Sequence, residues 1–458
     1  MITSTTNPQP ADFADVRATN LAVVLRFVRE HAPCSRADIA ASTGLNKATV
    51  SSLVADLIDR RLVRETGLTE NRVGRPATML VLDGSPYAAI GIEINVDYVT
   101  AVAVDLSGER LLSWRRSFSG GAGAAGADPA GAVPAGEGGA SGGDPGGDPG
   151  APGHPGAAGA PGAPGAPGAP GAPGAPGMPG SVGQAVGAVA AIVRRVVGRM
   201  AKQERQVLGL TVGVPGLVGT DGTVLVAPNL GWRGADLAGD LAKALRDPGF
   251  PVQVDNDANL AALAEHRFGA QAGTADLVYL TGEIGVGAGV ILDGRLRRGG
   301  RGYGGEIGHI QLDPLGPECR CGRTGCLEAV AGIGAVLRHA PLSPAEVEIE
   351  LEEVVRLARA GDPGTLSLLA GVGRQLGKGV AIVANLLNPE VVILGGYYVP
   401  LAPWLLPAVE EETRGRTIAP DGGGCRVVAS TLGHDAAALG GAARVLDSVD
   451  SGRLPRLS

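Results

Sequence analysis

The apolar positions between residues 19 and 82 follow the spacing of three short helices. The first helix has a single apolar stripe, which consists of Leu21, Val24, Leu25 and Val28. Ser35 opens a second helix, and Asp38 completes an approximate capping box. Gly44 provides a turn before a third helix that Asn46 can cap. The apolar stripe of this third helix consists of Val50, Leu53, Val54 and Leu57. This is the spacing of a helix-turn-helix unit.

The segment that follows reads as a β-hairpin. Residues 62–82 contain two short apolar strands around a polar tip, Gly67–Arg75, which would form a wing. We therefore expect a winged helix-turn-helix domain over residues 19–82. Residues 1–18 are polar and lack periodicity, and we interpret them as a flexible tail.

From residue 87 to residue 450, short Val/Ile-rich runs bounded by glycine alternate with longer stretches of helical spacing. The candidate strands are Ala88–Ile94, Val99–Asp105, Val207–Gly213, Leu277–Thr281, Gly287–Leu292 and Val391–Leu394. The candidate helices include Val182–Gln203, Ala258–Phe268 and Val372–Leu387. This alternation predicts an α/β domain over residues 83–450, followed by a short tail, 451–458.

One segment interrupts this domain. Residues 119–181 are dominated by Gly, Ala and Pro, and glycine recurs at every third position from Gly153 to Gly180. A segment with so few large apolar residues cannot bury a core, so we expect an extended, disordered insertion. The alternative is a collagen-like triple helix, which would require three chains to meet in parallel.

Composition narrows the class of protein. The chain has 458 residues, of which 44% are apolar, enough for substantial cores. The N-terminus has no basic segment followed by an apolar stretch, and no run of about 18 apolar residues occurs, so we expect a cytoplasmic protein without a membrane partner. The net charge is −7, yet residues 16–80 contain ten Arg or Lys and six Asp or Glu, a local charge of +4.

This local charge favours DNA as a partner of the N-terminal domain. The outward face of the third helix offers short polar groups for a major groove, namely Asn46, Lys47, Thr49, Ser51 and Ser52. Arg60 lies just beyond them, and Arg75 stands before a proline at the wing tip, where it would suit a narrow minor groove. The alternative is a small three-helix domain whose charges are merely solvated.

Three of the five cysteines are clustered. Cys319, Cys321 and Cys326 follow His309 at short spacing, and glycines between them allow a tight knuckle. Three thiolates and one imidazole form a ligand set that tetrahedral zinc accepts, and four protein ligands indicate a structural zinc ion rather than a catalytic one.

Polar residues that could bind a sugar lie near this cluster and after a predicted strand. Glu306, His309 and Glu328 flank the metal ligands, and a loop held by a metal is well suited to bind sugar hydroxyls. Asn256 and Asp257 stand between a predicted strand and a helix, where ligands collect in open α/β folds. Each carboxylate taken alone could instead be a solvated surface charge.

These motifs resemble the ROK family, in particular its transcriptional regulators of the xylose and N-acetylglucosamine type. The resemblance covers most of residues 19–447 and is most specific in Gly-Glu-Ile-Gly-His followed by Cys-x-Cys-Gly-x-x-Gly-Cys-x-Glu, residues 305–328. It implies a two-lobed, actin-like sugar-kinase fold of the ribonuclease H type. It also implies that the residues named above bind a sugar and a zinc ion in the cleft.

The sequence departs from the family's kinases at both phosphate loops. Where the kinases have Asp-x-Gly-x-Thr, this chain has Glu93-Ile-Asn95-Val-Asp97. Where they have Gly-Thr-Gly-x-Gly, it has Gly282-Glu283-Ile284-Gly285. A carboxylate beside phosphate is repulsive, so we expect no enzyme activity. Asp257, at the general-base position of the kinases, is retained, but no catalytic residue is predicted.

Together these features predict a sugar-responsive repressor that binds a palindromic operator as a homodimer or homotetramer. The first alternative is an ATP-dependent sugar kinase with an appended DNA-binding head. A second is a DNA-binding protein that responds to a protein partner or a phosphosugar.

Overall fold

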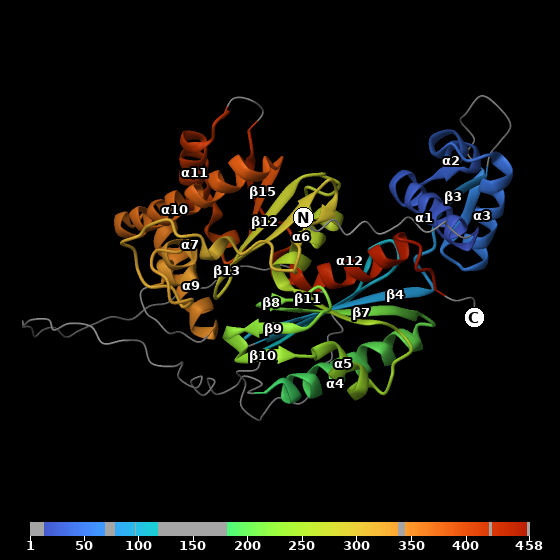
Figure 1. Ribbon diagram of the computed structural model, residues 1–458, viewed down its shortest axis with the longest axis horizontal. Helices are drawn as coiled ribbons and strands as arrows, with labels where there is room; N and C mark the ends of the chain where they lie inside the picture. The colour runs from blue at the N-terminus through green and yellow to red at the C-terminus, as the bar shows by residue number, and fades with distance from the viewer. Residues whose placement is uncertain are drawn as a thin grey trace, which may run out of the picture. The chain divides into compact units, whose positions relative to one another are not determined.

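The computed structural model describes residues 13–68, 78–96, 98–117, 181–337, 344–420 and 424–455. The insertion expected at residues 119–181, including its collagen-like repeat, lies almost entirely outside these residues, as do the tip of the expected wing and Asp97. The described residues form an N-terminal head and a larger α/β domain (Figure 1).

The head has the predicted winged helix-turn-helix architecture. Its helices are α1 (Phe13–His31), α2 (Arg36–Thr43) and α3 (Lys47–Asp59). Its strands are β1 (Cys34–Ser35), β2 (Val63–Leu68) and β3 (Thr78–Leu82), in the antiparallel order β1-β3-β2. Helix α1 begins at Phe13, six residues before the expected start of structure, and Arg17 in this added stretch forms an ion pair with Asp56 of α3 at 2.9 Å.

Local capping explains where the helices of the head begin. The Ser35 hydroxyl accepts a hydrogen bond from the Asp38 backbone N–H, and the Asp38 carboxylate accepts one from the Ser35 N–H at 2.9 Å. Gly44 ends α2 in the left-handed conformation with φ of 72°. The Asn46 side chain then accepts a hydrogen bond from the Thr49 N–H at 2.8 Å and caps α3. The apolar stripes predicted for α1 and α3 are buried.

The first lobe of the larger domain is built on a five-stranded sheet of order β11-β7-β4-β5-β6. Its strands are β4 (Tyr87–Ile94), β5 (Tyr98–Val104), β6 (Arg110–Ser117), β7 (Gln206–Val214) and β11 (Val252–Asn256). A small antiparallel sheet joins β8 (Leu217–Val218), β9 (Val224–Ala227) and β10 (Trp232–Ala235). Helices α4 (Val182–Lys202) and α5 (Leu237–Leu245) cover one face of the main sheet (Figure 1).

The second lobe repeats this plan with a sheet of order β14-β13-β12-β15-β16. Its strands are β12 (Leu277–Gly282), β13 (Val286–Leu292), β14 (Arg295–Leu296), β15 (Val391–Gly396) and β16 (Arg426–Ala429). Its helices are α7 (Leu327–Ala331), α8 (Ile333–Val336), α9 (Pro344–Arg359), α10 (Pro363–Leu387) and α11 (Tyr398–Arg416). The predicted strands agree with the observed ones to within two residues, whereas α10 begins nine residues earlier than expected because Asp362 caps it through the Thr365 N–H.

Among the described residues, α10 alone is long and apolar enough to cross a membrane by length and composition. Half of its most apolar stretch is buried inside the protein. A buried core helix passes the same test, so this is weak evidence for a membrane span.

Helices α6 (Asp257–Phe268) and α12 (Ala436–Asp450) pack against each other and connect the two lobes. Helix α12 lies on β4 and β7 of the first lobe, and α6 lies on β12 and β13 of the second (Figure 1). Their backbones approach so closely that a methyl group on Gly440 would overlap the Leu260 carbonyl oxygen. A methyl group on Gly91 would likewise overlap the Ala438 carbonyl oxygen. Small residues are therefore required where α12 meets both α6 and β4.

We predict that Gly440→Ala lowers the free energy of unfolding by about 2 kcal/mol, because the added methyl group overpacks the contact between α6 and α12. The matched control is Gly198→Ala in α4, where nothing lies within 4 Å of an added methyl group. That exposed helical substitution should raise the free energy of unfolding by about 0.5–1 kcal/mol. Urea denaturation measures both, and equal effects of the two substitutions would contradict the packing argument.

Candidate functional site

Segments from both lobes meet around a cavity of about 630 Å³. All the residues that the sequence predicted for sugar binding line it, namely Asn256, Asp257, Glu306, His309 and Glu328. They come from the β11–α6 junction, from the short 3₁₀ turn Ile307–His309 with the residue before it, and from the first turn of α7. The fold thus brings together polar groups that are up to about 70 positions apart in the chain.

The start of α6 holds two of these groups in defined positions. The Asn256 side chain accepts a hydrogen bond from the Asn259 N–H at 2.9 Å and donates one to the Gly216 carbonyl at 3.0 Å. The Asp257 carboxylate accepts one from the Ala258 N–H at 2.8 Å. Loss of hydration in the cleft raises the pKa of Asp257 to about 7; the bond from Ala258 opposes this shift, and the charge of Glu306 adds to it. Asp257 can therefore accept a proton or a hydroxyl hydrogen bond near neutral pH.

Two further carboxylates face the cavity from the other side. Glu328 accepts a hydrogen bond from the Val286 N–H at 3.0 Å, and Gly285 is small enough to let that carboxylate approach the backbone. Glu306 is open to solvent at the cavity, but the surrounding protein removes part of its hydration and raises its pKa. The charge of His309 lowers this pKa, and that of Glu328 raises it.

The predicted metal ligands lie beside these carboxylates. The ligand atoms of His309, Cys319, Cys321 and Cys326 all lie within 4.8 Å of one another. The sulfur atoms of Cys321 and Cys326 are 3.7 Å apart, and Nδ1 of His309 is 3.7 Å from the sulfur of Cys319. Two sulfur ligands of a tetrahedral zinc ion, with bonds of about 2.3 Å, lie about 3.8 Å apart. The cluster therefore has the geometry of a metal-binding site.

Backbone conformation forms this knuckle. Gly322 and Gly325 have φ values of 85° and 63°, and a methyl group on Gly325 would overlap the Asp313 carbonyl oxygen. The Cys319 N–H donates to the Arg323 carbonyl at 2.7 Å. The same segment supplies two cavity residues that the sequence did not single out, Arg320 and Arg323. Their place inside the Cys-x-Cys-Gly-x-x-Gly-Cys motif was the available signal.

A buried polar cluster lies on the first-lobe side of the cavity. Asn95 lines the cavity and donates to the Tyr98 hydroxyl at 2.8 Å, and this hydroxyl donates to Glu93 at 3.1 Å. Burial raises the pKa of Glu93 to about 8, and the charge of Asp257 contributes to this shift. Glu283 lines the same cavity from the loop after β12.

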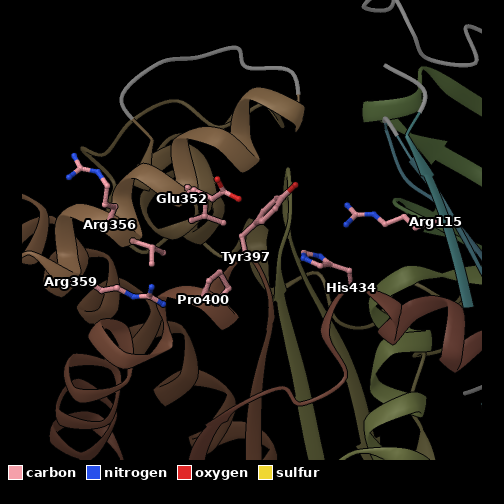
Figure 2. A pocket seen from close by; sticks show the side chains of 9 residues that line it. Arg115, Glu352, Arg356, Arg359, Tyr397, Pro400 and His434 are labelled. Atoms are coloured by element: carbon pink, nitrogen blue, oxygen red, sulfur yellow. The ribbon is translucent and has the colours of Figure 1, made fainter. Parts of the chain in front are cut away.

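A second cavity of about 540 Å³ lies beside Tyr397, which follows the paired glycines Gly395 and Gly396 (Figure 2). Arg115 and His434 face Tyr397 across it, and Glu352, Arg356 and Arg359 come from α9. Arg356 forms an ion pair with Glu353 at 2.6 Å. These lining residues are spread from position 115 to position 434, so no local motif could have revealed them.

The head presents the predicted polar face of α3. Asn46, Lys47, Ser51 and Ser52 are exposed, and Thr49 is half-buried. Arg60 has other partners: it bonds to Asp56 at 2.7 Å and to the Pro455 carbonyl at 2.8 Å. Arg75 lies outside the described residues. The roles of all these residues in DNA binding stay predictions.

Comparison with known proteins covers both parts of the chain. The ROK family model matches residues 184–448, and a MarR family model matches residues 22–71. The xylose repressor of Bacillus subtilis (strain 168) is 28% identical over 437 residues, which are 95% of this chain and 97% of that protein. The DNA-binding transcriptional dual regulator NagC of Escherichia coli (strain K12) is 26% identical over 92% of this chain and 91% of its own.

A solved structure is also similar. A ROK family transcriptional regulator described as a homolog of the E. coli MLC protein has a TM-score of 0.70 at 25% identity, and the match covers 96% of this chain and 98% of that one. The family expected from the Gly-Glu-Ile-Gly-His and cysteine motifs is thereby confirmed. Because its model matches more than half of the residues, the chain belongs to the ROK family.

Proposed function

We propose that this protein is a cytoplasmic transcriptional repressor whose affinity for a palindromic operator is controlled by a neutral sugar bound in the cleft. The observation that carries the proposal is the combination, in one chain, of an exposed polar face on α3 and a cavity lined by amide and carboxylate groups. The similarity to proteins named xylose repressor and NagC over more than nine-tenths of the chain supports the same function.

The chemistry of the cavity favours a neutral sugar. Asp257, Glu306 and Glu328 can each accept hydrogen bonds from sugar hydroxyls, and Asn256 lies beside them. Three carboxylates in one cleft repel phosphate. Arg320 and Arg323 also line the cavity. The alternative ligand is therefore a phosphosugar whose phosphate reaches these arginines, and the compounds tested for binding must include sugar phosphates.

The protein has a second candidate function, sugar phosphorylation. The cavity beside Tyr397 favours it, because arginines there could attract a nucleotide. The phosphate loops oppose it: in the sequence, Asn95 replaces the glycine of the family's kinases, Asp97 replaces their threonine, and Glu283 adds a carboxylate to the second loop. Without a bound phosphoryl donor, Asp257 at the general-base position performs no transfer.

We infer that the cysteine cluster holds a structural zinc ion. His309, Cys319, Cys321 and Cys326 would supply four ligands, which leaves no coordination position open for substrate. The ion would position the segment that carries Glu306 and Glu328. We further infer a homodimer, because two copies of α3 related by a two-fold axis would match palindromic half-sites about one helical turn apart.

Removal of zinc should weaken both folding and sugar binding. We predict that Cys326→Ser loses stoichiometric zinc, lowers the melting temperature by several degrees and reduces sugar affinity at least tenfold, because the loop that carries the carboxylates is released. The control is Cys425→Ser, which changes a cysteine outside the cluster. Elemental analysis and calorimetry measure these effects, and unchanged zinc content in Cys326→Ser would refute the assignment.

The operator and its effector can be found together. The full-length protein is used to capture genomic DNA fragments, which are then challenged with free sugars and sugar phosphates. We expect a discrete palindrome that one neutral sugar releases. Lys47→Glu should weaken operator binding about tenfold or more by loss of a cation at the DNA face, whereas Lys202→Glu at the exposed end of α4 should not.

In the same experiment, the Glu306→Gln variant should bind the operator normally, but the sugar should release it poorly because a carboxylate that accepts sugar hydroxyls is missing. Release by a sugar phosphate alone would replace the neutral-sugar proposal. Phosphorylation of any sugar above background in a coupled ATP assay would favour the kinase function.

The stability of the protein should depend on the charge of Glu93. Its pKa is about 8 in the folded protein, against an ordinary value of 4.5, so the folded state holds this proton more tightly than the unfolded state does. The resulting stabilisation is present below pH 4.5 and is lost as the pH rises through 8. We predict that the unfolding free energy of Glu93→Gln falls less steeply between about pH 6 and 9 than that of the wild type, as measured by urea denaturation. An equal dependence of the unfolding free energy on pH in the variant and the wild type would contradict the raised pKa of Glu93.

A further inference from the structure

One helix begins at the cavity and ends near the head. Asn256 and Asp257 at the start of α6 line the cavity, and Arg267 lies in the last turn of the same helix. A helix transmits a shift of one end to the other because its backbone hydrogen bonds keep its length fixed. Any movement of the β11–α6 junction on ligand binding is therefore carried to Arg267.

The far end of α6 is joined to α12 by ion pairs. Arg267 donates from Nη1 to Asp447 at 2.8 Å and to Asp450 at 2.8 Å. The side chain of Arg267 is 12% exposed and that of Asp450 is 9% exposed, so water screens this pair poorly. The close contact between Gly440 and Leu260 prevents the two helices from sliding independently.

Asp450 also bonds to the head. The same Oδ2 atom that accepts from Arg267 accepts a hydrogen bond from Arg29 of α1. One carboxylate thus bridges an arginine of the ligand-binding domain and an arginine of the DNA-binding head. Because removal of a charge from a poorly hydrated cluster leaves its partners uncompensated, the position of α1 depends on where α12 and α6 place this carboxylate.

The residues after α12 contact the other end of the head. The Pro455 carbonyl accepts a hydrogen bond from Arg60, which caps α3, and the Arg60 carbonyl accepts one from the Tyr87 hydroxyl at 2.6 Å. Gly452, with φ of 91°, lies against Ala18 of α1. Helix α12 and residues 452–455 therefore contact both α1 and the C-terminal cap of α3, the helix that would bind DNA.

We propose that Arg267, Asp450 and Arg29 form the link through which the cleft controls the head, with α6 and α12 as the rigid elements between them. The proposal rests on the proposed function and names the residues of its regulation. A sugar that binds better to one position of α6 shifts Asp450 relative to Arg29, and the orientation of the head changes with it. A merely structural ion cluster would hold the head equally well with and without sugar.

The experiment uses the full-length protein, together with the operator and the sugar that the capture of genomic fragments identifies. Operator affinity is measured by fluorescence anisotropy without sugar and at saturating sugar, and the ratio of the two dissociation constants is the coupling. Sugar affinity is measured separately by calorimetry. We expect a wild-type ratio between about 5 and 150. Asp450→Asn, Arg29→Gln and Arg267→Gln should each bring the ratio to within about twofold of one, while sugar affinity changes by less than about threefold.

Two controls separate coupling from folding. Arg110→Gln removes the ion pair of Arg110 with Asp435 at 2.9 Å, which joins β6 to the turn before α12 without reaching the head, and should leave the ratio unchanged. Arg29→Lys keeps a cation beside Asp450 and should restore most of the ratio lost in Arg29→Gln. The double variant Arg29→Gln/Asp450→Asn should have the same ratio as the two single variants, because all three break the same link.

The outcomes distinguish this proposal from the function on which it rests. If the wild type responds to sugar and the three variants respond equally well, the proposed link is wrong and the repressor function stands. If the wild-type ratio is one for every sugar, the sensor function itself fails and the link with it. If the Arg267→Gln variant and the Arg29→Gln variant each lose affinity for the sugar, the ion-pair cluster supports the cleft and does not communicate with the head.

Discussion

The close contact between α6 and α12 is the constraint on which the larger domain depends. Each helix covers the sheet of a different lobe, and the two helices approach until backbone meets backbone at Gly440 and Leu260. Larger side chains would separate them and change the angle between the lobes. The cavity lies at the start of α6, and the contact with the head lies at the end of α12, so both follow from the same packing.

Carboxylates dominate the lining of the cleft. They are suited to accept hydrogen bonds from hydroxyl groups, but burying them together lowers the stability of the folded protein. The charge of Glu306 raises the pKa of Asp257, and the charge of Asp257 raises the pKa of the buried Glu93. Such groups are costly unless a ligand, a proton or a cation compensates them. Hydroxyl groups of a sugar, and a metal ion held by the adjacent His/Cys cluster, would supply that compensation, whereas the phosphates of ATP would add to the repulsion.

This arrangement explains how an enzyme architecture can serve as a sensor. A kinase uses closure around its ligands to exclude water and to position a phosphoryl group, and a regulator needs only the differential affinity of one ligand for two conformations. The loops that hold Asn95 and Glu283, where the family's kinases approach ATP, lie outside the contact between α6 and α12. The packing that connects the two lobes therefore does not depend on the residues in these loops.

The sequence by itself determined whatever depends on neighbouring residues. Capping at Ser35 and Asn46, the periodicity of the buried strands, and the spacing of the cysteine knuckle with His309 all act over short stretches of chain, so composition and order reveal them. Helix α12 is not among the helices named from the sequence, and the need for its small residues is visible only where another backbone approaches. The bridge from Arg29 to Asp450 joins residues 421 positions apart, one partner of Arg60 is the Pro455 carbonyl near the other end of the chain, and no motif marks the second cavity. Only the tertiary structure decided these features, because each depends on surfaces that meet after both lobes and the head have folded.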